Sequence, residues 1–543
     1  MAASMNQLYY GDNLDVLRRH VEDESVDLVY LDPPFNSSAS YNVLFAERDG
    51  AHAASQIKAF EDTWEWDESA ARAFDEVVES GGRVSEAMQA FRVFLGESDM
   101  LAYLAMMAPR LVELRRVLKS TGSIFLHCDP TASHYLKMLL DAVFGPQNFC
   151  NEIIWKRTSG HSDARRQFAD QSDTILFYAA SDNATFNVQH AAYSEKYIKS
   201  HYSTTDESGR PYTTRDLRSP HPRPNLTYDY KGYQPHPNGW SVSLERMKEL
   251  DAAGLLYFPK SKDGRIRIKR YLDQMPGTRI GNVWDDISPI NSQAQERLGY
   301  PTQKPEALLE RIVSAGSNEG GLVLDPFCGC GTTIAAAQKL KRRWIGIDIT
   351  HLAITLIRSR LTDTFGGTVP YEVIGEPVSL PDAAKLAADD PYQFQWWALG
   401  LVGARPVEQK KGADKGIDGR IYFHEGPGQT KQIVLSVKAG KLHAPYVRDL
   451  RGVLDREKAD IGILISLDEP TGPMRKEAAS AGFYKSPWGK HPRIQLVTVE
   501  DLLTGKGIDR PPAQASVTFK RAPRAAPKSG EQGTIFGTED EPA

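Results

Sequence analysis

Cysteine is scarce in this chain of 543 residues, which contains only 4 of them. They are Cys128, Cys150, Cys328 and Cys330, and neither a CxxC pair nor a histidine cluster accompanies them. So few cysteines exclude a disulfide framework and indicate a reducing compartment. The missing ligand pattern also argues against zinc, and we predict no bound metal in the main part of the chain.

Long apolar runs and an excess of positive charge are missing as well. No stretch of about 20 apolar residues occurs, and the first residues lack the apolar core of a signal peptide. We therefore expect a soluble, cytoplasmic protein with no membrane partner. The formal net charge is −5, which does not by itself indicate nucleic-acid binding. A basic face can still act locally, because charge interactions are screened beyond ~8–10 Å at physiological salt.

The first informative motif follows an apolar run near the start of the chain. Residues 25–31 read as a buried strand after a predicted helix over 13–21, and Asp32, Pro33, Pro34 and Phe35 follow. Ligands of open α/β sheets bind at such strand ends. Such a motif suits a ligand that carries an amino group on an aromatic ring, which is a weak nucleophile because its lone pair is delocalised into the ring. Asp32 and the Pro33 carbonyl could accept the N–H bonds of this amine, and Phe35 could stack on the ring. The alternative interpretation is an ordinary Asp-Pro-Pro turn.

A second motif lies far downstream and predicts a nucleotide-like cofactor. The pattern predicts a strand over 321–324, a glycine turn from Asp325 to Gly331, a helix over 332–340 and a strand over 343–348. Glycines such as Gly329 and Gly331 let a backbone approach a ligand closely. Asp348 is placed to accept hydrogen bonds from ribose hydroxyls. The third glycine of the G-x-G-x-x-G fingerprint is absent, which makes NAD the weaker choice.

These two motifs, in this order, resemble those of the β-class amino DNA methyltransferases. The resemblance extends from Leu8 to Phe365 and includes the segments 10–13, 121–145, 151–155, 277–284 and 299–306. It implies a Rossmann-like α/β domain over residues 1–365 that binds S-adenosylmethionine (AdoMet), extrudes the target base and needs no metal for methyl transfer. In that family the segment around His127 shapes the pocket, so we favour this role over a nucleophilic one. The resemblance also implies double-stranded DNA as substrate and a homodimer.

The residues that the resemblance assigns to the site fall into two groups. The catalytic group is Asp32, Pro33, Pro34 and Phe35. The cofactor group is Asp12, Lys304, Asp325, Phe327, Gly329, Gly331 and Asp348. For Asp12 a plain helix N-cap is the structural alternative.

The target base follows from the first residue of the catalytic motif. Asp-Pro-Pro-Phe is the adenine type, whereas N4-cytosine enzymes usually carry serine first, so we predict site-specific N6-adenine methylation. The alternatives are an N4-cytosine enzyme, an RNA amino-methyltransferase, and a non-catalytic subunit that keeps the methyltransferase shape.

Residues 156–287 are predicted to form an inserted target-recognition region. Arg157 lies in an expected mobile loop, and residues 260–270 read as a basic β-hairpin around an Asp-Gly turn. Alternation places Arg265, Arg267 and Lys269 on one face, where they could contact DNA phosphates. The alternative is a solvated outer face.

The remaining chain is predicted to contain a linker over 366–391, a separate domain over 392–510 and a disordered tail over 511–543. The separate domain resembles the PD-(D/E)xK restriction-endonuclease-like family. Asp418 and Lys438 match its motif, and Glu408 could be the upstream acid. Ser436 occupies the position of the second acid, and serine is a weaker Mg²⁺ ligand than a carboxylate.

We therefore predict lost or weakened cleavage, with Mg²⁺ required only if this domain cuts. A bifunctional restriction–modification enzyme is the alternative. In the tail, residues 532–536 (QGTIF) resemble a sliding-clamp-binding peptide, and an accidental match is the favoured interpretation.

Overall fold

The computed structural model describes residues 5–34, 40–46, 52–61, 66–158, 168–291, 294–300, 302–407, 416–426, 429–512, 518–519 and 522–524. The chain forms two compact units. One comprises Met1–Asn187 with Asn282–Ala543, and the other is Val188–Gly281. None of the described helices combines the length and apolar character needed to cross a membrane.

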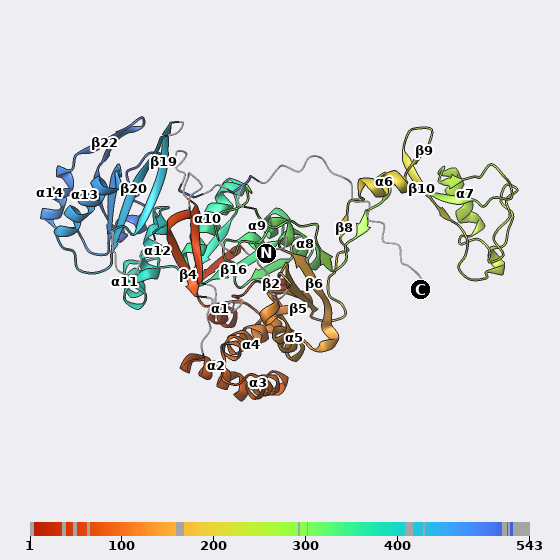
Figure 1. Ribbon diagram of the computed structural model, residues 1–543, viewed down its shortest axis with the longest axis horizontal. Coiled ribbons are helices and arrows are strands. Elements are labelled where there is room, and N and C mark those ends of the chain that lie inside the picture. The colour runs from red at the N-terminus through yellow and green to blue at the C-terminus, as the bar shows by residue number, and fades with distance from the viewer. Residues whose placement is uncertain are drawn as a thin grey trace. The chain divides into compact units, whose positions relative to one another are not determined.

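A mixed sheet of nine strands forms the centre of the first unit, in the order β14-β6-β7-β5-β2-β15-β16-β1-β17 (Figure 1). Its members are β1 (Asn6–Tyr10), β2 (Val26–Leu31), β5 (Leu118–Cys128), β6 (Phe149–Lys156), β7 (Ser172–Ala179), β14 (Val283–Trp284), β15 (Leu322–Asp325), β16 (Arg343–Asp348) and β17 (Tyr371–Ile374). All neighbours are parallel except β7, which runs antiparallel to β5 and β6. The sheet confirms the predicted α/β class.

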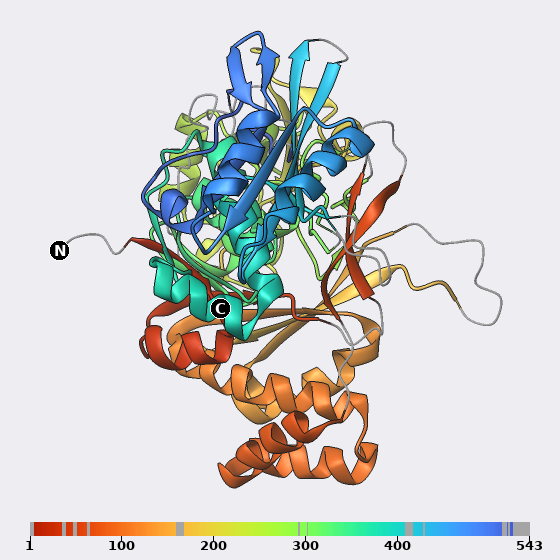
Figure 2. The same cartoon turned by 90° about the vertical axis from the view of Figure 1, so that its left-hand side faces the viewer.

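Helices cover both faces of this sheet, as a doubly wound fold requires. They are α1 (Asn13–His20), α2 (Glu68–Glu79), α3 (Gly82–Leu95), α4 (Asp99–Val117), α5 (Pro130–Phe144), α8 (Glu306–Gly316), α9 (Thr332–Lys339) and α10 (His351–Phe365). One face carries α1, α4 and α5, with α2 and α3 packed outside them (Figures 1 and 2). The other face carries α8, α9 and α10. A short antiparallel pair, β3 (Ser40–Ala46) and β4 (His52–Glu61), follows the first motif.

Apolar burial explains why the strands form where the sequence predicts them. The residues Leu28, Val29 and Leu31 of β2 have no solvent exposure, and neither do Ile124 and Leu126 of β5. Buried side chains on both sides of a strand are typical of parallel strands covered by helices on both faces.

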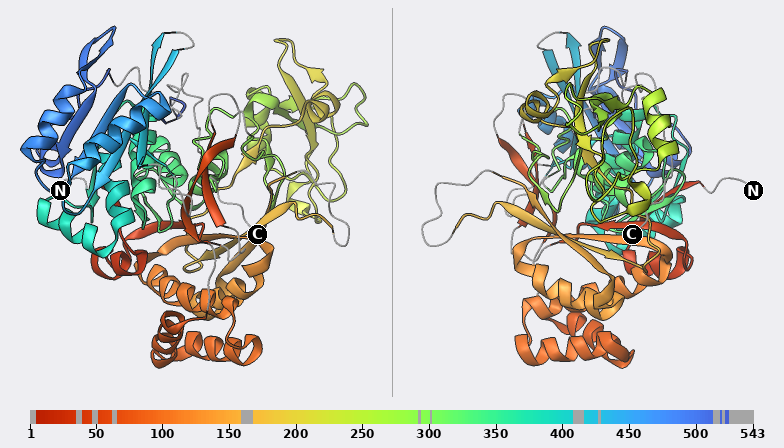
Figure 3. Two further views of the ribbon diagram at one scale, coloured as in Figure 1. Left: turned by 60° about the vertical axis from the view of Figure 1, so that its left-hand side comes forward. Right: turned by 90° about the vertical axis from the view of Figure 1, so that its right-hand side faces the viewer.

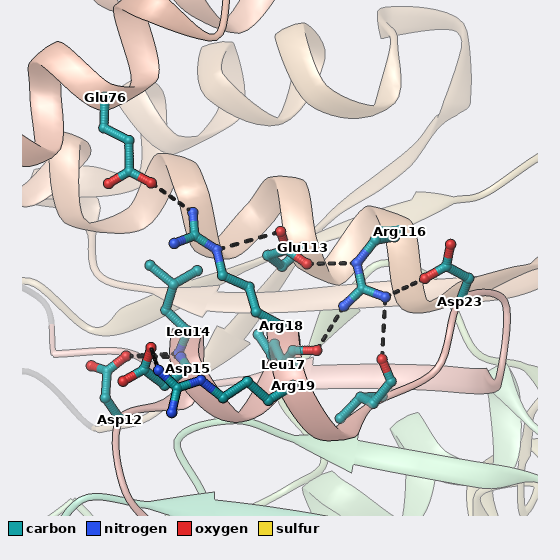
Figure 4. A network of polar contacts seen from close by, with 11 residues as sticks. Asp12, Leu14, Asp15, Leu17, Arg18, Arg19, Asp23, Glu76, Glu113 and Arg116 are labelled. Atoms are coloured by element: carbon teal, nitrogen blue, oxygen red, sulfur yellow. Dashed lines mark hydrogen bonds and ion pairs between the residues drawn. The ribbon is translucent and has the colours of Figure 1, made fainter.

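Ion pairs fasten α1 to the neighbouring helices (Figure 4). Arg18 lies 2.9 Å from Glu76 of α2 and 3.6 Å from Glu113 of α4. Arg116 also binds Glu113, and it pairs with Asp23 in the turn before β2. These contacts fix the helix whose N-terminus begins at the functional site.

The second unit, Val188–Gly281, has its own small core around Trp240, Met247 and Ile266. Its elements are β8 (His190–Ala191), α6 (Glu195–His201), β9 (Thr204–Thr205), β10 (Pro211–Asp216), α7 (Leu244–Ala252), β11 (Leu256–Tyr257), β12 (Arg267–Tyr271) and β13 (Thr278–Arg279). This unit is shorter than the insert expected over 156–287, because β7 and β14 belong to the central sheet. The apolar run over 174–180 was the sequence pattern that could have predicted β7.

The basic segment of this unit pairs differently from the expected hairpin. Arg267 of β12 lies opposite Tyr257 of β11 and Asp216 of β10, so the Asp-Gly dipeptide lies within a longer loop. Ile266 is fully buried, while Arg265 and Arg267 are exposed. The predicted alternation is therefore confirmed there, but the partner strands were wrong.

The C-terminal domain contains a five-stranded sheet in the order β18-β19-β20-β21-β24 (Figure 3). Its strands are β18 (Arg405–Pro406), β19 (Gly419–Gly426), β20 (Gln429–Lys438), β21 (Ile461–Ser466) and β24 (Ile494–Thr498), and β22 (Phe483–Ser486) pairs with β23 (Gly489–Pro492) outside it. Its helices are α12 (Pro391–Leu401), α13 (Pro445–Glu457), α14 (Gly472–Ser480) and α15 (Val499–Leu503).

The stretch predicted as a linker is folded. β17 pairs with β1 at the edge of the central sheet, and α11 (Leu380–Asp389) packs against α12. Ser379 caps α11 through the Asp382 N–H, and Ala383 is fully buried. An alanine-rich helix with a serine cap was mistaken for irregular chain. Most of the predicted tail, including 532–536, lies outside the described residues.

Candidate functional site

A cavity of about 240 Å³ lies at the C-terminal edge of the central sheet. Gly11 follows β1, Asp32 follows β2, and Asp325 and Asp348 end β15 and β16. Because the parallel strands end at one edge, these residues meet there although the chain separates them widely. The predicted residues that line the cavity are Asp12, Asp32, Pro34, Lys304, Asp325, Phe327, Gly329 and Asp348. The two predicted half-sites therefore form one cavity.

One carboxylate oxygen of Asp32 has a hydrogen-bond partner, and the other has none among the described residues. Its Oδ2 accepts a hydrogen bond from the Lys304 ammonium at 2.5 Å, and both side chains are largely buried. Its Oδ1 is also buried and has no hydrogen-bond partner among the described residues. A buried acceptor without a donor is unusual in a folded protein and indicates a place for a ligand N–H.

The glycine turn after β15 is tied to the end of β16. The Gly329 N–H donates to Asp348 Oδ2 at 2.9 Å, and the Phe327 N–H donates to Asp325 Oδ1 at 3.0 Å. Gly329 has a φ of +49°, and a Cβ there would lie 3.1 Å from the Tyr300 ring. Gly331 has a φ of +75° and caps α9, so it shapes the turn without lining the cavity.

The carboxylates of the cavity wall are poorly solvated. Burial raises the pKa of Asp325 to about 7, although hydrogen bonds from Thr333 and Phe327 oppose the shift. Burial likewise raises the pKa of Asp348 to about 6 against its hydrogen bonds from Thr350 and Gly329. Perturbed carboxyl groups in a cavity are typical of a functional site.

Asp12 is the N-cap of α1, as the structural alternative predicted, and it also lies at the cavity. Its Oδ1 caps α1 through the Leu14 N–H at 2.8 Å, and its Oδ2 pairs with Arg110 at 2.6 Å. Asp12 also lines the cavity beside Arg110. Arg110, which lies within the long apolar helix α4, was not predicted as part of the site.

The other predicted residues lie elsewhere. Pro33 is buried and is not among the residues that line the cavity, and Phe35 lies outside the described residues. Arg157 pairs with Asp173 at 3.1 Å at the start of the expected loop. The residues Arg265, Arg267 and Lys269 belong to the second unit. Tyr30 and Tyr300 line the cavity and were not predicted; Tyr30 shares a strand face with Asp32, two positions on, which was the available signal.

The acidic residue of the predicted nuclease motif already accepts hydrogen bonds from other residues of the motif. Asp418 is buried, and its Oδ2 accepts from the Ser436 hydroxyl at 3.1 Å and from the Val437 N–H at 2.6 Å. The Lys438 ammonium lies over the Tyr446 ring at 5.3 Å. Glu408 lies outside the described residues. Within the described part of the chain, no group of three acidic, histidine or cysteine side chains could hold a metal ion.

Comparison with known proteins supports the two-part organisation. The model of the DNA methylase family that covers N6 and N4 enzymes matches residues 26–359. The model of the NACHT-associated inactive restriction endonuclease 1 matches residues 393–504. The first match includes Asp32, Lys304 and Asp348, and the second includes Asp418, Ser436 and Lys438.

Individual relatives agree with the first match. The chain is 30% identical to the type II methyltransferase M.EcaI of Enterobacter cloacae, over 65% of this chain and 69% of that protein. It is 28% identical to the Mod subunit of the type III restriction-modification enzyme StyLTI of Salmonella typhimurium strain LT2, over 72% and 58%. The solved M1.HpyAVI–SAM complex is 14% identical, with a TM-score of 0.31, over 66% and 99%. Since the family match covers more than half of its length, the chain belongs to the N6/N4 DNA methylase family.

Proposed function

We propose that this protein is a site-specific DNA methyltransferase that transfers a methyl group from AdoMet to the N6 amino group of an extruded adenine in duplex DNA. The observation that carries the proposal is the buried, unpartnered Oδ1 of Asp32 at the wall of the cavity. An N–H of the target amine would satisfy this oxygen.

The residues of the cavity fit AdoMet as the methyl donor. Gly329 lines the cavity with a positive φ of +49°, and a backbone without a side chain can approach a ligand closely there. Asp348 offers carboxylate oxygens to ribose hydroxyls, and Phe327 and Ile349 offer apolar surface to a purine. AdoMet supplies an electrophilic methyl group on a sulfonium centre.

The chain itself has to orient the amine and exclude water. Asp32 Oδ1 would accept one N–H of the amine, while Lys304 holds Oδ2. The Pro33 carbonyl is the candidate acceptor for the second N–H. These acceptors draw the lone pair out of conjugation with the ring, so correct positioning accounts for most of the rate enhancement.

Adenine is the proposed target because the tetrapeptide begins with aspartate. The carboxylate accepts hydrogen bonds and carries a full charge, which suits the positive charge that develops on the amino nitrogen. Arg265 and Arg267 are exposed in the second unit and are the proposed phosphate contacts. The homodimer stays a prediction.

The test is to incubate the pure protein with AdoMet and duplex DNA of mixed sequence. Methylated nucleosides are then quantified by mass spectrometry, and DNA without AdoMet is the control. The proposal expects N6-methyladenine. N4-methylcytosine would correct the target base and keep the mechanism, whereas no modified nucleoside would overturn the proposed activity.

A further inference from the structure

A hydrogen-bonded row of three buried polar side chains leads away from the cavity wall. The Tyr30 hydroxyl lies 3.0 Å from His127 Nδ1, and His127 Nε2 lies 3.0 Å from Asp173 Oδ2. All three side chains are almost completely buried, and Tyr30 lines the cavity beside Asp32. Tyr30 comes from β2, His127 from β5 and Asp173 from β7, so this row of side chains crosses neighbouring strands of the central sheet.

The direction of these hydrogen bonds depends on which ring nitrogens of His127 carry hydrogen. Burial raises the pKa of Asp173, but the hydrogen bond and charge of His127 and the charges of Lys304 and Arg157 bring it below its ordinary value. An ionised carboxylate only accepts, so His127 Nε2 carries a hydrogen. In the tautomer that has its one hydrogen on Nε2, Nδ1 accepts from the Tyr30 hydroxyl, and the Tyr30 oxygen keeps lone pairs for a further hydrogen bond.

Methylation of an amine creates a need that this arrangement can meet. When the lone pair forms the N–CH₃ bond, the C–S electron pair stays on sulfur and the nitrogen becomes cationic. The nitrogen must then lose a proton. Asp32 Oδ2 already accepts a hydrogen bond from the Lys304 ammonium.

We propose that Tyr30 is a further residue of the amine site, and that His127 and Asp173 are positioning residues that keep its oxygen ready to accept the amine proton. The inference rests on the proposed methyl transfer to an exocyclic amine. The N–H electron pair stays on nitrogen while the proton passes to the Tyr30 oxygen. Tyr30 gives its own proton to His127 Nδ1, and the imidazolium lies against the Asp173 carboxylate. After product release, the reverse transfer returns the proton to water in the cavity.

This coupled transfer avoids a tyrosinate. Burial and the charges of Asp32, Asp325 and Asp173 hold the pKa of Tyr30 well above its usual value. A phenol in such a place relays a proton only when a base takes its own at the same time. His127 is the base in contact with it.

The variant that tests the inference is Tyr30→Phe, with Tyr178→Phe as the matched control. Tyr178 lies on β7, is equally buried, and donates to Asp141 at 2.7 Å away from the cavity. Single-turnover methylation with AdoMet and DNA already bound should slow roughly 10–100-fold for Tyr30→Phe and for His127→Phe. The control should stay near the unsubstituted rate.

Two further measurements separate positioning from simple damage to the fold. The double variant Tyr30→Phe/His127→Phe should be no slower than either single variant, because the residues act as one unit. The affinity for AdoMet and the melting temperature should change little, and His127→Gln provides a second substitution if His127→Phe folds poorly. Nitrogen NMR of the unsubstituted protein should show His127 protonated on Nε2, with an Nδ1 signal that moves in Tyr30→Phe.

An unchanged single-turnover rate in Tyr30→Phe would overturn the inference. So would a His127 ring protonated on Nδ1, or additive losses in the double variant. Failure of the proposed function looks different, since the unsubstituted protein would then methylate no DNA, and the relay would fall with it.

Discussion

Lys304 and Asp32 form a largely buried ion pair with a separation of 2.5 Å, although they are 272 positions apart in the sequence. The resemblance assigned Lys304 to the cofactor, yet its ammonium contacts the carboxylate that we propose to be catalytic. It holds Oδ2, while Oδ1 is buried and has no partner among the described residues. We therefore expect Lys304 to act on the chemical step.

Replacing Lys304 tests this expectation. Lys304→Met should lower kcat roughly 100-fold, because Asp32 loses the group that orients it. Lys304→Arg should retain part of the activity. Steady-state kinetics and calorimetric AdoMet binding distinguish the two roles, with the more exposed Lys339→Met as control. A large loss of AdoMet affinity at unchanged kcat would return Lys304 to the cofactor.

Asp32→Ala should abolish methylation and leave AdoMet binding largely intact. The substitution removes the acceptor for the amine, whereas the glycine turn and Asp348 remain. Asp23→Ala is a suitable control, because Asp23 is an exposed acid in the turn before β2. Measurable methylation by Asp32→Ala would show that the catalytic site has been assigned wrongly.

AdoMet affinity should fall as the pH drops through about 6. Burial raises the pKa of Asp348 to about 6 in the free protein, so the carboxyl gains a proton below that pH. The protonated carboxyl is a poorer acceptor for ribose hydroxyls, and binding weakens on the acidic side. Calorimetry between pH 5 and 8 measures the effect. Asp348→Asn should bind weakly with little pH dependence, and an unchanged pH profile in this variant would exclude Asp348 as the cause.

Mg²⁺ should not turn this protein into a nuclease. The Asp418 carboxylate already accepts hydrogen bonds from Ser436 and the Val437 N–H, and the serine adds only a neutral oxygen. Duplex DNA incubated with protein and Mg²⁺ should remain intact on a gel. Cutting that requires Mg²⁺ and is lost in Lys438→Ala would contradict this prediction.

The double variant Arg265→Ala/Arg267→Ala should weaken DNA binding about equally on all sequences. If each arginine neutralises one phosphate, the slope of log affinity against log salt should fall by about 1 per residue removed. Lys385→Ala, an exposed lysine on α11, is the control. An unchanged slope would mean that Arg265 and Arg267 face solvent in the complex with DNA.

The parts of the site that the sequence predicted are those that local pattern determines. Asp32, Asp325 and Asp348 each end an apolar strand, and parallel strands bring such ends together. The pairing of Lys304 with Asp32 depends on how distant segments pack, and no local pattern specifies it. The same holds for Tyr30, His127 and Asp173, whose link requires β7 to run antiparallel beside β5.

Errors in the predicted fold also have physical causes. The segment over 366–391 is rich in proline, alanine and aspartate. This composition occurs both in irregular segments and in short helices with a capping residue. The partner strands of β12 come from residues 211–216 and 256–257, and an Asp-Gly dipeptide cannot reveal that the loop is longer than the turn it suggests.

The pairing of β17 with β1 bears on how this protein can be divided. A version that stops at residue 365, where the methyltransferase resemblance ends, would lose β17 and leave one edge of β1 unpaired, while its other edge stays paired with β16. Unpaired edges attract other chains and promote aggregation. Extending the fragment past Ile374 keeps this edge covered. The residues of α11 already belong to the core of the C-terminal domain, so a boundary placed between Ile374 and Leu380 keeps β17 with the central sheet and α11 with that core.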